Sequence, residues 1–256
     1  MLIDLHLHTS RYSSCGKATP QEMLAGATAA GLDAVVITEH HTIWPLSELQ
    51  LLRASFPRIR IFRGMEVTCD RGRADILVLG VSDPDVAVMG MRPDEIINRV
   101  HRAGGVAILA HPFRMRSSIP AELLATPPDA YEVMSLNMPA YARHQAPLLA
   151  RLWPEAHQVA CSDAHQVAGL GAYAILLDRP VANESELAAA VREGAFRLVV
   201  DEQKLRQRHP HWRAQQERVE ALMAAGLSYQ QIRRETGLSR ALVRYVMAGG
   251  DLVGDA

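Results

Sequence analysis

The sequence lacks the cysteine pairs that form disulfide frameworks or structural zinc sites. Cys15, Cys69 and Cys161 lie far apart, and no CxxC motif occurs in the 256 residues. An odd number of isolated cysteines favours a reducing compartment. The first residues do not resemble a secretory signal, because Asp4 and His6 interrupt the apolar run at once. We therefore expect a cytoplasmic protein.

Long apolar runs and several common enzyme motifs are missing as well. No run is long enough to span a bilayer, so no membrane partner is expected. No GxSxG elbow, P-loop or GxGxxG fingerprint follows an expected strand. With 48% hydrophobic and 21% charged residues, the chain has the composition of an ordinary soluble globular protein.

The charge balance divides the chain into two parts. The net charge is −1, yet residues 204–247 hold nine Lys and Arg against three Asp and Glu, a surplus of +6 that leaves −7 for the rest. An acidic body followed by a basic tail indicates two units with different roles. We predict one domain over residues 1–200 and a small all-α unit over residues 204–256.

Short apolar runs alternate with helical patterns in the larger unit. Helices are expected over 19–31 and 92–105, because each begins with Pro in its first turn and ends at Gly. Alternating strands and helices are typical of parallel sheets with right-handed crossovers. About seven such units predict a closed or nearly closed α/β barrel, with an open doubly wound sheet as the alternative. The expected strands are 2–5, 33–38, 59–62, 75–80, 105–110, 130–135, 158–162 and 172–177.

Titratable side chains stand at the ends of five expected strands. The carboxyl ends of strands in such folds meet at one face, where active sites form. Imidazoles mixed with carboxylates suit a polynuclear centre of Mn, Fe or Zn better than a closed structural zinc site. Two adjacent metals assist phosphoester hydrolysis by a metal-activated water, so no serine or cysteine nucleophile is required. The residues are His6 and His8, Glu39 and His40, Glu66, His111, and Asp163 with His165.

Five segments occur in the order and spacing of a known family. They are DLHLHT (4–9), VVITEHH (35–41), RGMEVT (63–68), AILAHPFR (107–114) and CSDAH (161–165). Residues 1–200 therefore resemble the PHP (polymerase and histidinol phosphatase) family. The resemblance implies a distorted (β/α)7 TIM-like barrel with two or three divalent metal ions at the strand ends. It also implies hydrolysis of phosphoesters, from histidinol phosphate and nucleotides to nucleic acid ends.

The resemblance assigns metal-binding roles residue by residue. Glu66 matches the carboxylate that bridges two metals, and we expect Glu66, His8 and Asp163 to be the catalytic residues. Asp4 is expected to orient a ligand rather than to bind metal. The matched ligands are His6, His8, His40, Glu66, His111, Asp163 and His165, with Glu39 and Asp75 as additional candidates.

Two positions depart from the family pattern. Many members have Asp or His six residues after the second histidine, where this chain has Ser14, and many begin the fourth strand with His, where it has Asp75. Asp75 can still bind metal, whereas serine is a poor ligand. We expect two metals, or a third held only by His40 and His165 together with water or substrate.

Phosphate needs unpaired cations close to the metals. Arg114 follows His111 by three residues, and its guanidinium matches phosphate oxygens. The alternative is a surface arginine paired with a neighbouring carboxylate. Lys17, in the loop after the first strand, is the second candidate. Cys15 and Cys161 are near the expected site, but we interpret both as buried structural thiols.

The basic tail has a helical pattern of its own. A helix is expected over 211–226, and residues 227–249 resemble a helix-turn-helix with its turn at Gly237 and Ser239 capping the second helix. Arg240 and Arg244 would then contact nucleic acid. Packing, or dimerisation into a homodimer, is the alternative role of this unit.

Three functions are compatible with the sequence. The leading one is metal-dependent hydrolysis of a small phosphomonoester or nucleotide by a metal-activated water at a di- or trinuclear site. A second is a nuclease or phosphatase that acts on nucleic acid ends through the basic tail. The third is a non-enzymatic, metal-stabilised scaffold with a DNA-binding regulatory tail, which Ser14 favours and the retained ligands oppose.

Overall fold

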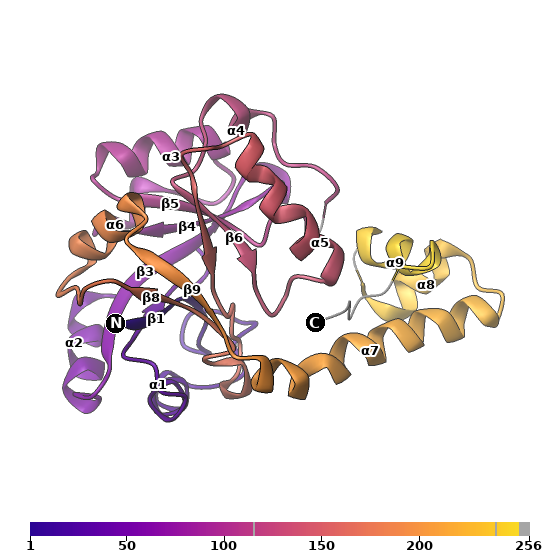
Figure 1. Ribbon diagram of the computed structural model, residues 1–256, viewed down its shortest axis with the longest axis horizontal. Coiled ribbons are helices and arrows are strands. Elements are labelled where there is room, and N and C mark those ends of the chain that lie inside the picture. The colour runs from indigo at the N-terminus through magenta and orange to yellow at the C-terminus, as the bar shows by residue number, and fades with distance from the viewer. Residues whose placement is uncertain (115, 239, 251–256) are drawn as a thin grey trace.

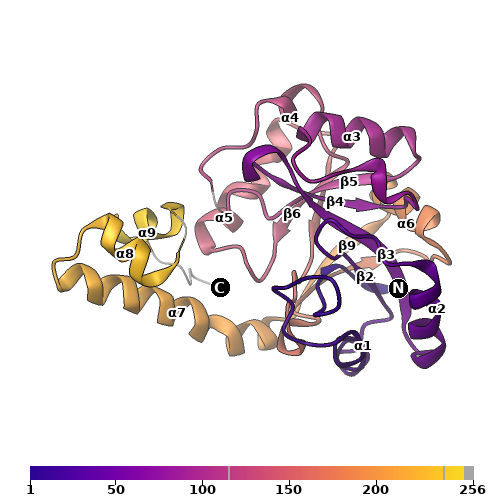
Figure 2. The same ribbon diagram turned by 180° about the vertical axis from the view of Figure 1, so that it is seen from behind.

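The computed structural model describes residues 1–250 except 115 and 239, and the side chains of these residues except 206–211 and 241. Ser239, the expected helix cap, therefore lies outside the described residues. The centre is a nine-stranded sheet that curls into a barrel, with helices around its outer side (Figures 1 and 2). The strands are β1 (Leu2–Leu7), β2 (Ala34–Ile37), β3 (Arg60–Thr68), β4 (Asp75–Leu79), β5 (Val106–Ala110), β6 (Ala130–Met134), β7 (His157–Ala160), β8 (Tyr173–Leu177) and β9 (Phe196–Val200).

The strand order shows a nearly closed barrel. The order is β7-β6-β5-β4-β3-β2-β1-β8-β9. β7 lies beside β8 and β9, although no hydrogen-bonded ladder joins them within the described part of the chain. Beyond β7, Ala164 forms a parallel bridge with Leu7, which brings the end of β1 against the segment after β7. The predicted α/β barrel is thus confirmed.

The expectation of parallel strands throughout is wrong for β4 and β8. β4 runs antiparallel to both β3 and β5, and β8 runs antiparallel to β1 and β9. Only a short turn that contains the 3-10 segment Asp70–Gly72 separates β3 from β4, and this is too short for a parallel crossover. Pairing with β4 also prolongs β3 to Thr68, so Glu66 lies within the strand rather than after it.

The helices begin and end at recognisable signals. α1 begins with a capping box between Thr19 and Glu22, and α6 begins at the Asn183 cap and ends at Gly194 in the left-handed conformation. The α-helices are α1 (Pro20–Ala29), α2 (Leu46–Ser55), α3 (Pro93–Arg102), α4 (Glu122–Ala125), α5 (Ala140–Gln145), α6 (Glu184–Glu193), α7 (Glu202–Ala224), α8 (Tyr229–Thr236) and α9 (Arg240–Met247). Short 3-10 segments occur at Asp70–Gly72, Pro84–Val86, Ala146–Arg151 and Val167–Gly169.

The C-terminal helices differ from expectation in where they begin. α7 starts at Glu202 instead of residue 211, because the Asp201 side chain accepts a hydrogen bond from the Lys204 amide and caps a longer helix. α7 leads away from the barrel to the α8–α9 pair, which packs back toward α5 (Figure 1). The rings of Tyr141 on α5 and Tyr245 on α9 are 4.7 Å apart.

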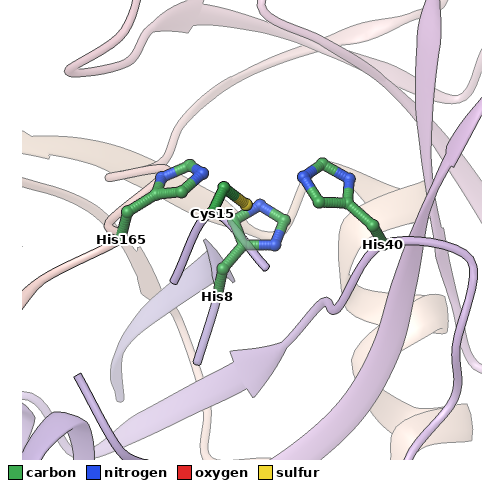
Figure 3. A group of neighbouring side chains, drawn as sticks. All are labelled: His8, Cys15, His40 and His165. Carbon is green, nitrogen blue, oxygen red and sulfur yellow. The ribbon is translucent and has the colours of Figure 1, made fainter. Parts of the chain in front are cut away.

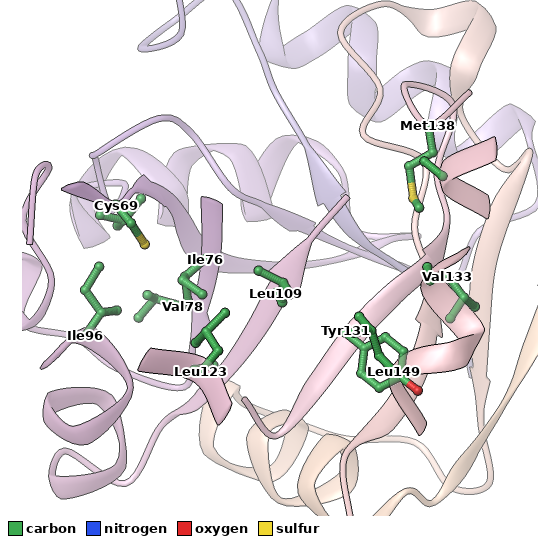
Figure 4. Packing of buried hydrophobic residues seen from close by; sticks show 14 of the residues in the cluster. Cys69, Ile76, Val78, Ile96, Leu109, Leu123, Tyr131, Val133, Met138 and Leu149 are labelled. Atoms are coloured by element: carbon green, nitrogen blue, oxygen red, sulfur yellow. The ribbon is translucent and has the colours of Figure 1, made fainter. Parts of the chain in front are cut away.

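Apolar side chains fill the space between the sheet and the helices outside it. Figure 4 shows one such cluster, in which Ile76, Val78 and Leu109 of the sheet face Ile96 of α3 and Leu123 of α4. All five side chains are buried. Burial of this kind stabilises the scaffold by about 1.5–3 kcal/mol for each large side chain, which fixes the strand ends where the candidate site lies.

Candidate metal centre

The candidate site begins at β1, where the strand departs from regular pairing. The register between β1 and β2 shifts between Asp4 and Leu7. At this point Asp4 Oδ1 accepts hydrogen bonds from the amides of His6 and Ser162. His6 and His8 consequently converge, with their Nε2 atoms 3.0 Å apart. Through Oδ1, Asp4 thus contacts the backbone of two site segments.

Glu66 lies at the centre of the histidines. Its Oε1 accepts a hydrogen bond from His111 Nε2 at 2.8 Å. Its Oε2 lies 3.2 Å from His8 Nε2 and 3.0 Å from His40 Nδ1. A backbone bridge between His40 and Glu66 fixes these two residues side by side. One carboxylate therefore reaches two groups of imidazoles, as a bridging ligand must.

Asp163 closes the inner side of the site. Its Oδ2 accepts hydrogen bonds from Asn137 Nδ2 at 2.8 Å and from Arg114 Nη1 at 3.2 Å. Its Oδ1 lies 3.3 Å from the Nε2 atoms of both His6 and His8, and it is a buried oxygen with no hydrogen-bond partner in the described part of the chain. A buried carboxylate oxygen left in this state, facing two imidazole nitrogens, fits a bound cation.

We call His6, His8, Glu66, His111 and Asp163 the inner cluster. All five are buried, and their donor atoms form groups close enough to hold a metal ion. Asp75 joins Glu66 and His111 in one further group. It does so because β4 is antiparallel, which brings the first residue of β4 next to Ala110 at the end of β5. The donor set of imidazoles and carboxylates fits divalent Mn, Fe or Zn.

The backbone is strained at two residues of the inner cluster. His111 has a φ of 28° and Asp163 a φ of 50°, in the left-handed region that side-chain-bearing residues rarely adopt. Strain of this kind costs roughly 1–3 kcal/mol per residue and is concentrated at functional sites. The fold therefore holds His111 and Asp163 in backbone conformations that these residues rarely adopt on their own.

In the inner cluster the carboxylates and the imidazoles shift each other's pKa so that both kinds of side chain favour their charged forms. Burial alone would raise the pKa of Glu66 and of Asp163, but the surrounding imidazoles hold both values well below the ordinary range. Burial alone would lower the pKa of His8, but Asp163 and Glu66 raise it to about 9. In the metal-free chain the imidazolium protons thus occupy the place that cations would take.

Cys15, His40 and His165 form a second group, which we call the outer cluster. Their donor atoms lie within 4.8 Å of one another and of a nitrogen of His8. The side chains of His40 and His165 are 34% and 25% exposed, whereas Glu66 is 1% exposed. Cys15 is only half-buried, so the expectation of a buried structural thiol is wrong for this residue, although it is right for Cys161.

Glu39 lies outside both clusters. Its carboxylate accepts hydrogen bonds from Thr9, Ser13 and Trp44. Ser13 Oγ also lies 3.3 Å from His8 Nδ1. Glu39 therefore supports the loop that carries His8, and its oxygens are engaged there.

Sequence reasoning missed Glu132, which is fully buried on β6. Its Oε1 accepts a hydrogen bond from His6 Nδ1 at 2.7 Å, and its Oε2 accepts one from the His111 amide at 2.7 Å. This contact fixes the His6 ring so that Nε2 faces the cluster. The available signal was a single acid inside the apolar run AYEVM.

A cavity of about 400 Å³ opens beside the two clusters. Asp163 and His165 line it, together with the candidate phosphate ligands Lys17 and Arg114. Arg143 adds a third cation. Arg114 pairs with Asp163, as the alternative interpretation expected, and its binding of phosphate stays a prediction. Leu205 and Trp212 of α7 also line the cavity.

Comparison with known proteins identifies relatives of the whole barrel. The PHP domain model matches residues 4–169, and the PHP-associated model matches residues 157–196. The chain is 32% identical over 123 residues to the uncharacterized protein MJ1587 of Methanocaldococcus jannaschii, a match that covers 44% of this chain and 68% of that protein.

Solved structures show the same fold. A two-domain protein from Bacteroides vulgatus that contains a predicted PHP-like metal-dependent phosphoesterase superposes with a TM-score of 0.62 at 17% identity, over 79% of this chain and 65% of that one. This chain therefore spans about two thirds of that protein. PsfC from Pseudomonas syringae superposes with a TM-score of 0.56 at 18% identity, over 79% of this chain and 92% of PsfC.

None of the helices in the described part of the chain is both long and apolar enough to cross a membrane.

The five segments that suggested a family all fall within residues 4–169, which the PHP domain model matches. That match extends over well more than half of the chain and over every residue of the inner cluster. The protein belongs to the PHP family.

Proposed function

We propose that the protein is a metal-dependent phosphoesterase that hydrolyses a small phosphomonoester. The position of Glu66 carries this proposal. Its two carboxylate oxygens divide between His111 on one side and His8 and His40 on the other. Such an arrangement supports a bridged pair of metal ions, the centre that phosphoester hydrolysis uses.

The chain's own residues would hold and orient the centre. His6, His8 and Asp163 would bind one ion, and Glu66 would join it to a second at His111 and Asp75. Divalent ions bound there would lower the pKa of a water molecule and stabilise negative charge on the phosphoryl oxygens. Asn137 and Arg114 hold the Asp163 carboxylate in place by hydrogen bonds to Oδ2, which leaves Oδ1 for the cation.

The cavity indicates a small anionic substrate. Lys17, Arg114 and Arg143 line it, and these cations would neutralise a phosphate group and fix its orientation. At about 400 Å³ the cavity has the size of sites for small molecules. Leu205 and Trp212, which also line the cavity, would contact the organic part of the substrate. These features favour a phosphomonoester with an apolar or aromatic group over a nucleic acid strand.

A metal and substrate survey tests the proposal. Protein purified without chelator is analysed for bound metal by mass spectrometry and is then assayed with phosphomonoesters and phosphodiesters in the presence of Mn, Fe or Zn. We expect about two or three ions per chain and turnover of a monoester. Glu66→Gln should lose metal and reduce turnover by about 10²–10³-fold.

The matched control is Glu193→Gln, which changes an exposed carboxylate that pairs with Arg179 on the surface. It should retain both metal and turnover. A wild-type protein that binds metal but hydrolyses none of these esters would contradict the proposed activity. A protein that binds no metal when all three are supplied would contradict the metal centre itself.

A further inference from the structure

Ser14 occupies the position at which many PHP proteins have a metal ligand. The next residue, Cys15, has a side chain that can bind metal. Ser14 is exposed, whereas Cys15 is half-buried and turned toward the site. Figure 3 shows the Cys15 sulfur among the rings of His8, His40 and His165. The other two cysteines are fully buried and belong to none of the metal-competent groups in the described part of the chain.

The loop after β1 is built so that Cys15 reaches this place. Gly16 packs so closely on Thr9 that an added Cβ would lie 2.4 Å from the Thr9 carbonyl carbon. The next amide, Lys17 N, donates a hydrogen bond to the His165 carbonyl at 2.7 Å. The tight approach and this hydrogen bond join the Cys15 loop to the His165 segment. A residue other than glycine at position 16 would move the sulfur away from the histidines.

We propose that Cys15, His40 and His165 hold a third metal ion, and that the thiolate makes this position selective for zinc. His8 already directs Nε2 to the inner cluster, 3.0 Å from His6 Nε2, so it serves as a wall of the outer site and not as its ligand. The centroid of the His8 ring lies 4.4 Å from that of His40 and 4.5 Å from that of His165.

Ligand chemistry separates the two clusters. The inner cluster offers carboxylates, which suit Mn and Fe as well as Zn, whereas a thiolate with two imidazoles favours softer ions. Three protein ligands leave a fourth tetrahedral position for water or a substrate oxygen, which is the pattern of zinc sites that take part in reactions. The outer cluster borders the cavity through Cys15 and His165, so this open position would face the phosphate.

Cobalt provides a direct spectroscopic test in the full-length protein. The protein is stripped with chelator and titrated with Co²⁺, because a cobalt–thiolate bond gives a charge-transfer absorption in the near ultraviolet. We expect about three equivalents to bind and the charge-transfer band to appear with one of them. Cys15→Ser should bind about one equivalent less and lose the band. Cys15→His should restore the third equivalent without the band.

Cys69→Ala is the matched control, because Cys69 is buried in the core away from the site. It should retain the metal content and the band. Alkylation of the native wild-type protein gives a second measurement that needs no variant: Cys15 should react in the metal-free protein and be protected by Zn²⁺. A band that persists in Cys15→Ser, or alkylation that Zn²⁺ does not slow, would overturn the proposal.

The inference deepens the proposed function, since the third ion would lie beside the same cavity. Its readouts are metal content, absorption and thiol reactivity, and none of them requires turnover. A protein that shows the cobalt–thiolate band but hydrolyses no ester would retain the outer site and lose the proposed activity. A protein that hydrolyses esters with two bound ions and shows no cobalt–thiolate band would retain the proposed activity and lose the outer site.

Discussion

The inner and outer clusters share one rim of the barrel but are built differently. His6, Glu66 and Asp163 are buried, and their charges are matched within the cluster. The outer cluster is partly exposed, and its three members come from segments between named strands and helices, with Cys15 in the long loop between β1 and α1. The difference indicates that the inner donors are fixed in or close after strands of the barrel, while the outer cluster also depends on how the loop that carries Cys15 folds. Changes should therefore affect the two clusters separately.

The largest effect is expected from Asp163→Asn. This change removes the charge whose Oδ1 faces His6 and His8, while the hydrogen bond from Asn137 can persist. We expect turnover to fall by about 10²–10³-fold and inner metal to be lost. The cobalt–thiolate band should survive, which would sharpen the distinction between the clusters. Loss of the band together with the inner metal would show that the clusters form a single unit.

Glu132→Gln should have the next largest effect. Glu132 touches no substrate, but it holds the His6 ring and the His111 amide. Loss of such a supporting carboxylate weakens metal binding or activity by about 10–100-fold. Metal affinity measured by competition with a chelator is the readout, and the inner ions alone should be weakened. Unchanged inner affinity would contradict a positioning role for Glu132.

Arg114→Ala should act on substrate more than on metal. Its guanidinium lines the cavity, and Asn137 still holds Asp163 when the arginine is removed. Removal of one hydrogen bond to a charged group should raise KM about tenfold. Metal content should remain constant. A normal KM with reduced metal content would assign Arg114 to the support of Asp163 alone.

The stability of the metal-free protein should depend on pH through His8. Its pKa is raised from 6.5 to about 9 on folding. The stabilisation by the protonated ring is therefore complete below pH 6.5 and is lost as the pH rises through 9. We expect the melting temperature of chelator-treated protein to fall across this interval, and His8→Gln to reduce the fall. Zinc-loaded protein should not show it, because metal binding requires neutral imidazoles.

The smallest effect on the barrel is expected from the tail. Arg240 and Arg244 are exposed and, with Arg116, line a cavity of about 520 Å³ between α9 and the barrel. Nucleic-acid binding by residues 227–249 stays a prediction, as does a homodimer. If the tail binds nucleic acid, Arg240→Ala with Arg244→Ala should weaken oligonucleotide binding and flatten its salt dependence. Turnover of a small ester should not change. Binding that is insensitive to salt would exclude this role.

Much of the fold and of the candidate site could be predicted from the sequence. The inner donors lie in or close after strands that have clear apolar runs, so their convergence at one rim could be predicted. The direction of β4 was not, because a three-residue 3-10 turn reverses the chain where a crossover to a parallel strand was expected. The edge strand β9 was not among the expected strands, although its segment FRLVV is mostly apolar.

The roles of Glu132 and Cys15 were not predicted from the sequence, for different reasons. An acid within a buried strand is recognised only when its partners are known, and Glu132 meets His6 from the far side of the barrel. Cys15 reaches the histidines through the close approach of Gly16 to Thr9, a contact that no periodic pattern encodes.

The bridge between Leu7 and Ala164 has a consequence for folding kinetics. His8 N donates a hydrogen bond to the Ala164 carbonyl at 2.9 Å, so residues more than 150 positions apart must meet before the rim is complete. Contacts of such long sequence separation form slowly, because much chain entropy must be lost first. Metal should therefore be captured late in refolding, after the strands have assembled. The appearance of bound metal would then time the last step by which the barrel closes.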